Sequence, residues 1–466
     1  MAAIEARAVG HSTRAGEVTV RDISLAVGHG ELVAIIGGRG SGKTTLLDAL
    51  SGRRPPTSGT VSRSDARRVG YVPSGDSSPP VLPPAQALRY TAALRGVGGH
   101  GDAVDEALGM VGLTARAATP AVALDPGERK RADIAAELLA GPTELFLDEP
   151  TAGLDPAQAT QVLRLLRDLS DTGMTVVLTT SSSQDAVRCD KVAVLATGGH
   201  LAFYGTPAAA CGYFGADSLE EIYERLAGLG DPAAAWSRRF FYFSRTASGA
   251  TPVPTSPRAP GPALLVPDLA GPHSAGRVSP AGRDPDPEAD VLPSPAGAGA
   301  APGPARGGTA RMLPPVRQLP ILIIRNAAIL ARARRQQAVL AGVPAVVLLA
   351  FCVLLAVGAL DGPAAVTLAW AVLGGLAAGL AYQLPTRGPE RGVLRRERFA
   401  GLSTAAFVAA KAAVLLPLLA VADALILMVP AIADRLQAGF GLSYLAVFIA
   451  SAIGLAAATA TLLHDD

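Results

Sequence analysis

Cysteine is scarce in this chain of 466 residues, and the three cysteines present lie far apart. Cys189, Cys211 and Cys352 match neither the spacing of a metal site nor that of a disulfide framework. We therefore exclude a zinc-binding or disulfide-stapled fold. We expect the three thiols to be small buried side chains in a reducing compartment.

Charge is also scarce, at 17% of the residues, and the two signs nearly cancel to a formal net charge of +2. So small a net charge provides no basic field for nucleic acid, and we exclude nucleic acid as a partner. The arginines that do cluster lie beside apolar runs, which indicates membrane topology. A hydrophobic content of 49% and a mean hydropathy of +0.33 are too high for an ordinary soluble enzyme. Part of the chain is therefore expected to lie in lipid.

A secretion leader is not visible, because the opening MAAIEARAVG has no basic region leading into an apolar core. We expect the N-terminal part to stay in the cytoplasm. The alternation from Val18 to Val27 predicts a half-buried strand, and the run ELVAII predicts a fully buried one. Two sheets are expected to begin here.

The stretch GGRGSGKTT has the pattern of a phosphate-binding loop, two glycines separated by four residues and followed by Lys and Thr. A strand pattern precedes it and a helix pattern, TLLDAL, follows, so the glycine turn lies at a helix N-terminus. Backbone N–H groups would hold phosphates, Lys43 would reach the β and γ oxygens, and Thr44 would ligate Mg²⁺. The alternative is a chance glycine turn. The predicted phosphate-binding residues are Gly37, Gly38, Arg39, Gly40, Ser41, Gly42, Lys43, Thr44 and Thr45.

The run TELFLDEP ends in two carboxylates at the C-terminal tip of a predicted strand. In a doubly wound sheet, ligands bind at that edge. A solvated strand end is one interpretation of the pair. After a phosphate loop, we favour Asp148 as a Mg²⁺ ligand and Glu149 as the general base for an attacking water.

Further motifs narrow the assignment. LDPGERKR from Leu124 and TAGLD from Thr151, together with the loop and the acidic pair, resemble the ATP-binding cassette of ABC transporters. The stretches GYVPSGD, ALRYTAALR, TVVLTT, CDKVAVL and RRERFAGLS are similar to the White-type, or G-subfamily, half transporters. The resemblance implies an α/β P-loop NTPase followed by an all-α transmembrane helical domain. It also implies ATP and Mg²⁺ as cofactors, with ATP sandwiched between one chain's phosphate loop and the other's signature, and Asp155 in the D-loop.

Three family positions are altered here. Ser74 stands where the family has Gln after GYVP, and Ser181 stands where it has the switch histidine. The signature LSGGE is LDPGE, formed by Leu124, Asp125, Pro126, Gly127 and Glu128. A carboxylate about 4 Å from a phosphate would repel each unit of charge by roughly 4 kcal/mol at an effective dielectric near 20. We therefore predict slow hydrolysis.

The altered signature also has a purely structural interpretation. Asp125 as N-cap, Pro126 in the first turn and Glu128 as the capping-box residue predict a good helix start, with the helix running through Leu139. For the adenine base we find no confident aromatic partner, and His11 is a weak candidate.

Composition divides the chain into a cassette (1–245), a disordered Pro/Gly/Ala-rich linker (246–314), an amphipathic interfacial helix (315–336) and a transmembrane domain (337–466). Four apolar runs, at about 338–360, 363–384, 403–433 and 442–463, are each long enough to span a bilayer. The resemblance implies six spans, and we expect the last two to be missing here. The basic loop between the second and third runs faces the cytoplasm, and both ends then lie inside.

That loop resembles the family's coupling helix, with Glu390, Arg395, Arg396 and Glu397 at matching positions; the alternative is a charge run that only sets topology. Asp423, within the third run, is a functional candidate because intramembrane acids are costly, or it faces a water-filled cavity.

Two functions are compatible with these features. The first is an ATP-driven half transporter, a homodimer or a heterodimer with another half transporter, in the plasma membrane with its cassette in the cytoplasm. The second is a regulatory or vestigial subunit that binds nucleotide with little hydrolysis. The transported substrate is unknown.

Overall fold

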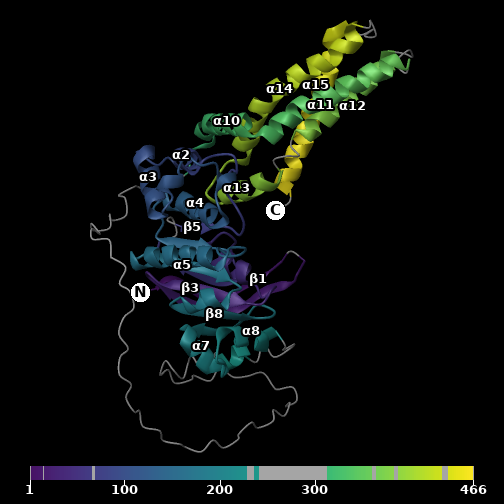
Figure 1. Cartoon of the computed structure of the whole chain (residues 1–466). Coiled ribbons are helices and arrows are strands. Elements are labelled where there is room, and N and C mark those ends of the chain that lie inside the picture. Colours follow the sequence, from purple (N-terminus) through teal and green to yellow (C-terminus); the bar gives the residue numbers. More distant parts are fainter. Residues whose placement is uncertain are drawn as a thin grey trace, which may run out of the picture. The chain divides into compact units, whose positions relative to one another are not determined.

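The computed structural model describes residues 2–13, 15–65, 69–227, 236–240, 312–358, 364–382, 387–432 and 439–464. The predicted linker, 246–314, lies outside the described residues except for 312–314. An α/β region forms the N-terminal part of the described chain, and helices alone form the C-terminal part (Figure 1). This order confirms the predicted fold class.

Among the described residues, the α/β region is built on a nine-stranded sheet in the order β4-β1-β2-β9-β8-β3-β7-β6-β5. The sequence predicted two sheets. Instead, an antiparallel part, β4-β1-β2, joins a mainly parallel part through a single pairing of Arg21 with His200. The strands are β1 (Ala2–Ser12), β2 (Val18–Gly28), β3 (Leu32–Gly37), β4 (Ser58–Arg63), β5 (Val69–Val72), β6 (Glu144–Leu147), β7 (Thr175–Thr180), β8 (Lys191–Ala196) and β9 (His200–Gly205).

The helices of this region begin at local signals. Helices α4, α5 and α7 each have a proline in the first turn and a side-chain N-cap, from Asp125, Asp155 and Thr206 respectively. The helices are α1 (Lys43–Ser51), α2 (Pro84–Leu94), α3 (His100–Met110), α4 (Pro126–Leu138), α5 (Pro156–Asp171), α6 (Ser183–Val187), α7 (Pro207–Phe214) and α8 (Leu219–Ala227), with 3₁₀ turns η1 (Thr114–Arg116) and η2 (Ala121–Ala123).

Strand β3 lies between β7 and β8, and all its residues are buried. A continuous apolar run suits a parallel strand covered on both faces. Leu32 and Ile36 belong to the same apolar cluster as residues of α4 and α5, whereas Val33 and Ile35 belong to the cluster that includes residues of α1. The strand thus divides two apolar cores and ends at the phosphate loop.

The C-terminal part is helical throughout its described residues. Helices α11, α14 and α15 are long and apolar enough to cross a membrane. Helix α12, in the second predicted span, has 18 residues, or about 27 Å at the usual rise. The four-span arrangement stays a prediction. The helices are α10 (Pro315–Arg332), α11 (Arg334–Ala356), α12 (Ala364–Ala381), α13 (Arg387–Phe399), α14 (Thr404–Ile432) and α15 (Gly439–His464).

Helix α10 ends four residues before the predicted end of the interfacial helix, because Ala333 leaves helical geometry with φ −82° and ψ 81°. One side is buried at Leu322, whereas Val316 is 83% and Ile324 60% exposed. An exposed apolar side beside a buried one agrees with a helix at the membrane surface, which stays a prediction.

Close packing joins α12 to α15. A Cβ added to Gly379 would overlap the carbonyl of Ser451, and one added to Gly454 would overlap that of Leu376. Glycine at such positions lets two helix backbones approach. In the same bundle the Asp423 side chain is buried and accepts a hydrogen bond from Ser451 Oγ at 2.9 Å.

The cysteines only partly follow the prediction. Cys189 is buried and Cys211 half-buried, but Cys352 is exposed on the outer face of α11. The prediction of three buried thiols is wrong for Cys352, because α11 turns part of its apolar surface away from the other described helices.

Candidate functional site

The phosphate loop connects β3 to α1 through glycines that no other residue could replace without strain. Gly37 and Gly42 have φ of 154° and 90°. A Cβ at Gly37 would overlap the carbonyl of Leu195, and one at Gly42 the carbonyl of Thr19. Side chains are therefore excluded at both ends of the loop, because its backbone packs closely against Leu195 on β8 and Thr19 on β2.

The loop has features that fit an anion. Helix α1 has no side-chain N-cap, so its first N–H groups face the loop. The buried Ser41 hydroxyl has no hydrogen-bond partner among the described residues. Lys43 Nζ folds back onto the carbonyls of Gly37 and Gly38, at 2.8 and 3.2 Å. Gly38, Arg39 and Gly40 are exposed. Donors without acceptors at a helix N-terminus form an anion site.

The two residues predicted to bind Mg²⁺ are in contact. Thr44 Oγ1 donates to Asp148 Oδ1 at 2.9 Å, although 104 positions separate them. Thr179 Oγ1, on β7, donates to the same oxygen at 2.7 Å. Hydroxyl and carboxylate oxygens are ligands that Mg²⁺ prefers, and the ion usually completes its shell with water and substrate phosphates. Thr45 follows in the first turn of α1.

Glu149 lies beside these residues in an unusual backbone conformation, with φ of 46°. Its N–H donates to Thr179 Oγ1 at 2.9 Å. One carboxylate oxygen, Oε2, accepts from both N and Oγ of Ser181, at 3.2 and 3.1 Å. The other, Oε1, lies 3.8 Å from Lys43 Nζ. The predicted base is thus held between the loop and the residue at the switch position.

The altered signature forms the start of α4. Glu128 N–H donates to Asp125 Oδ1 at 2.7 Å, and Asp125 N–H donates to Glu128 Oε2 at 3.0 Å. The predicted capping box is confirmed, with Pro126 in the first turn. Burial alone raises the pKa of Glu128, but hydrogen bonds from Arg116 and from the Asp125 N–H hold it below the ordinary value.

The flanking signature residues have structural contacts. Leu124 is buried, and its carbonyl accepts from Arg129 Nη1 at 2.7 Å. Gly127 leaves 3.0 Å between a built Cβ and the Cβ of Gln158, so α4 and α5 approach closely there. Asp155 caps α5 by accepting from Gln158 N–H at 2.9 Å. Each residue is explained by the fold alone.

Ser74 is exposed, and the loop that carries it is hydrogen-bonded to α4. Lys130 Nζ donates to the carbonyls of Pro73 and Gly75, at 3.3 and 2.7 Å. Burial lowers the pKa of Lys130, against the opposing effect of Asp133. Asp133 accepts from Ser77 N–H and from Ser78 Oγ, at 2.9 and 2.6 Å. The loop that carries Ser74 is therefore fixed to the helix that begins at the signature.

Helix α13 reaches this same loop. Arg396 Nη1 donates to Ser77 Oγ at 3.2 Å and lies 3.6 Å from Asp133 Oδ1. Its Nε lies 3.8 Å from Glu137 Oε1, which also accepts from Arg95 at 2.8 Å. These four charged side chains are buried. A Cβ at Gly392 would overlap the carbonyl of Asp76, so backbone also meets backbone.

The other predicted coupling residues behave differently. Glu397 turns to α10, where Arg325 Nη1 hydrogen-bonds its Oε1 in a buried pair. Arg395 is exposed, and the side chain of Glu390 lies outside the described residues. Phe399 lies within the stretch RRERFAGLS but is not among the predicted site residues, and its ring lies 5.6 Å from that of Tyr71.

His11 is a poor platform for adenine. Its side chain is 7% exposed, and Nδ1 lies 3.2 Å from Thr19 Oγ1. Burial lowers its pKa, and Arg54 adds to that effect. A ring this covered offers no open face to a base.

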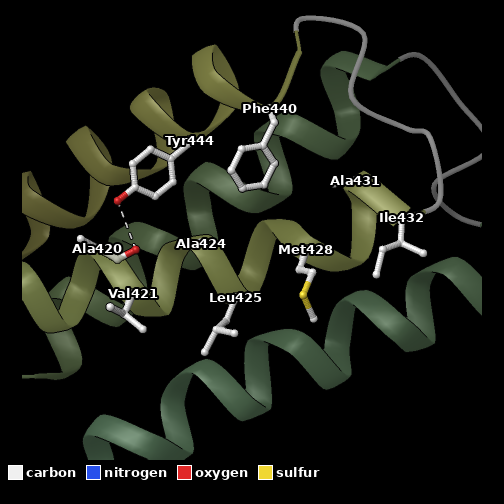
Figure 2. A pocket seen from close by; sticks show the side chains of 9 residues that line it. All are labelled: Ala420, Val421, Ala424, Leu425, Met428, Ala431, Ile432, Phe440 and Tyr444. Carbon is white, nitrogen blue, oxygen red and sulfur yellow. Dashed lines mark hydrogen bonds between the residues drawn. The ribbon is translucent and has the colours of Figure 1, made fainter.

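A groove of about 700 Å³ lies between α14 and α15, far along the chain from the loop. Figure 2 shows Ala420, Ala424 and Ala431 on α14 opposite Phe440 and Tyr444 on α15. The Tyr444 hydroxyl donates to the carbonyl of Ala420 at 3.2 Å. Apart from the hydroxyl of Tyr444, the side chains that line the groove are apolar.

Comparisons with known proteins agree on the N-terminal part. Residues 20–152 match the family described as ABC transporter. The chain is 38% identical to an ABC transporter ATP-binding/permease protein of Mycobacterium tuberculosis, over 51% of this chain and 29% of that protein. It is 30% identical to the linearmycin resistance ATP-binding protein LnrL of Bacillus subtilis, over 44% of this chain and 69% of that one.

A third relative is ATP-binding cassette sub-family G member 5 of Rattus norvegicus, 35% identical over 42% of this chain and 33% of that protein. The match thus spans about a third or less of the first and third relatives. Among solved structures, cbiO1 of Clostridium perfringens, part of an ABC transporter complex, covers 45% of this chain with a TM-score of 0.41 and 26% identity.

Proposed function

This chain belongs to the ABC transporter family, and from that membership we propose that it is a half transporter that couples ATP binding and hydrolysis to movement across a membrane. The observation that carries the proposal is the contact between Thr44 and Asp148 at the uncapped start of α1. That contact brings the predicted magnesium ligands to the predicted phosphate site.

For nucleotide binding, we infer that the triphosphate lies over residues 37–45. A phosphate would replace the carbonyls of Gly37 and Gly38 as partners of Lys43 Nζ. The uncapped N–H groups of α1 and the unpartnered Ser41 hydroxyl would donate to its oxygens. Thr44 and Asp148 would hold Mg²⁺, which neutralises phosphate charge when bound.

For hydrolysis, Glu149 would accept a proton from the attacking water. Its backbone is fixed by Thr179 and its carboxylate by Ser181. A general base contributes typically 10² to 10⁴ in rate, and Glu149→Gln removes the base while leaving the phosphate cradle. We propose that hydrolysis occurs and is slow, because the signature that should complete the site presents Asp125.

A single chain carries only one face of such a site, so we propose a dimer of two copies or of this chain with another half transporter. In a homodimer each phosphate loop would face LDPGE. With an unaltered partner, each of the two sites would still contain one altered half. No pairing supplies a site free of these changes.

For coupling, we propose that α13 transmits motion between the cassette and the membrane helices. Arg396 contacts Ser77 and Asp133, and Asp133 lies on the helix that starts at the signature. Glu397 ties the other side of α13 to α10 through Arg325. A shift of α4 or of the Ser74 loop would therefore move α13.

We further propose that α11, α12, α14 and α15 span the membrane with the cassette on the cytoplasmic side, in the plasma membrane. Three of them meet the length and composition of a span. The arginines of α13 lie between α12 and α14, and basic loops stay cytoplasmic. Introduced cysteines should then label at Gly388 from the cytoplasm and at Gly362 and Gln437 from the far side.

The alternative function is a regulatory subunit that binds nucleotide without useful turnover. This alternative is supported by the capping box, because the side chains of Asp125 and Glu128 are both engaged in hydrogen bonds at the helix start. ATP hydrolysis by the purified chain in lipid nanodiscs separates the two, with Glu149→Gln as the background. A wild-type rate above that background favours the transporter, and an equal rate with intact ATP binding favours the regulatory subunit.

A further inference from the structure

We propose that Ser181 is a positioning residue, which holds the carboxylate of Glu149 toward the phosphate loop. The inference rests on the proposed hydrolysis and adds a role for the serine. In the sequence, Ser181 is notable only because it stands where the family has the switch histidine. In the structure it contacts the predicted base directly.

The contact involves two donors on one oxygen. Ser181 N–H and Oγ–H both donate to Glu149 Oε2, at 3.2 and 3.1 Å. Lys43 Nζ lies 3.8 Å from Oε1. Each carboxylate oxygen thus has its own partner, so rotation of the carboxylate plane is restricted. The Glu149 side chain is 22% exposed, which leaves one side open to water.

The turn that presents Ser181 is itself fixed. Thr180 Oγ1 donates to the buried Asp185 Oδ2 at 3.0 Å and accepts from Ser182 N–H at 3.0 Å. Thr151 Oγ1, just beyond Glu149 in the chain, hydrogen-bonds the same Asp185 oxygen. Asp185 therefore ties the end of β6 to the end of β7, and so ties Glu149 to Ser181.

Side-chain size decides what Ser181 does. The hydroxyl is one bond from Cβ, so it reaches the neighbouring carboxylate and extends no further toward the phosphates. A hydrogen bond to a charged group corresponds to about tenfold to a hundredfold in an equilibrium or rate. Loss of the hydroxyl alone should cost about tenfold, because the Ser181 N–H remains.

The first test measures kcat and KM for Mg²⁺-ATP on the full chain in nanodiscs, for Ser181→Ala, Ser181→Thr and the control Ser183→Ala. Ser183 is the first residue of α6, two positions beyond Ser181, and the hydrogen bonds described for Glu149 do not involve it. We expect Ser181→Ala to lower kcat about tenfold at unchanged KM, with Ser181→Thr close to wild type and Ser183→Ala unaffected. In the Glu149→Gln background Ser181→Ala should have no further effect.

The second test needs no turnover. A cryo-EM map of nucleotide-free Ser181→Ala protein should lose the defined density of the Glu149 carboxylate, while Asp148 and Thr44 keep theirs. An unchanged Glu149 position in that map overturns the inference. So does an unchanged kcat in an active protein, or a loss that persists in Glu149→Gln. A wild type no faster than Glu149→Gln instead contradicts the proposed hydrolysis, and the map then decides the positioning role by itself.

Discussion

Helices α1 and α4 differ in whether side chains cap the first N–H groups of the helix. Helix α1 begins without a side-chain cap, behind glycines whose conformation only glycine adopts easily. Helix α4 begins with a complete capping box from Asp125 and Glu128. One start leaves its N–H groups for a ligand, and the other satisfies its own.

This difference indicates which contacts the N–H groups of each helix start are available to make. Glycine at the N-cap in place of a capping side chain costs only about a few tenths of a kcal/mol, and it leaves the first N–H groups of α1 free to bind an anion. At Asp125 the cap is present, at the position that we predict to correspond to the family's phosphate-facing serine. We therefore regard the α1 start as built for nucleotide and the α4 start as built for the fold.

The largest expected effect tests the buried charges that tie α4 to α13. Arg396→Ala removes one buried cation from beside Asp133 and Glu137, and Glu137 keeps its pair with Arg95. Breaking a buried pair typically costs about 3–5 kcal/mol, so we expect a loss near the lower end, about 3 kcal/mol. Arg164→Ala, at an exposed position on α5, is the control and should stay within about 0.5 kcal/mol. Denaturant unfolding of the full chain in detergent measures both. Equal effects would mean that the α13 contact contributes little.

Next in size is Lys43→Ala at the α1 start. Removing a charged donor to phosphate should weaken Mg²⁺-ATP binding about tenfold to a hundredfold, because such bonds are worth about 1.5–3 kcal/mol. Lys191→Ala, on β8 and paired with Glu31 away from the loop, is the control. Fluorescent-nucleotide titration is the measurement. If Lys43→Ala leaves the affinity for Mg²⁺-ATP unchanged, the start of α1 is not the nucleotide site.

A smaller effect concerns the α4 start. Asp125→Ala should destabilise the protein by about 1 kcal/mol through loss of the cap, whereas Asp125→Ser, a comparable cap, should be near neutral. Thermal unfolding of the two variants compares them directly. If both are neutral, the capping box does not explain why aspartate is present.

The smallest effect is a pH dependence on the α/β core. Burial raises the pKa of Glu144 to about 7, although Arg63 opposes the rise. This folded-state pKa lies above the ordinary value of 4.5, so the folded protein holds the proton of Glu144 more tightly than the unfolded chain does. The resulting stabilisation of the fold is complete below pH 4.5 and is lost as the pH rises through about 7. Glu144→Gln should therefore raise Tm at pH 8 by a few degrees and hardly change it at pH 5.

For this last prediction the control is Glu220→Gln, at an exposed position on α8. It should show no difference between the two pH values. A gain from Glu144→Gln that is equal at pH 5 and pH 8 would contradict a titrating carboxyl.

Sequence reasoning succeeded where the signal is local. The strand, glycine loop and helix from Leu32 to Ser51, and the helix start at Asp125, follow from neighbouring residues and are found as predicted. The contact of Thr44 with Asp148 was also predictable, because strand ends in a parallel sheet meet at one edge.

It failed where the partner is distant in sequence. Nothing near Arg396 indicates Ser77, which lies 319 positions away, and nothing near Glu397 indicates Arg325 on α10. The single pairing that joins two expected sheets, Arg21 with His200, is likewise invisible to local patterns. Periodicity gives the buried face of an element but not the element that covers it.

The most direct test of the account measures Mg²⁺-ATP binding and single-turnover hydrolysis on the same preparation, for wild type and for Asp125→Ser combined with Pro126→Gly. We predict equal affinity at the α1 start, slow Glu149-dependent hydrolysis in the wild type, and a rate about a hundredfold higher in the double variant, which is the lower end for one transition-state contact. Brisk wild-type hydrolysis that the double variant leaves unchanged would contradict the account, and Asp125 would then be only a helix cap.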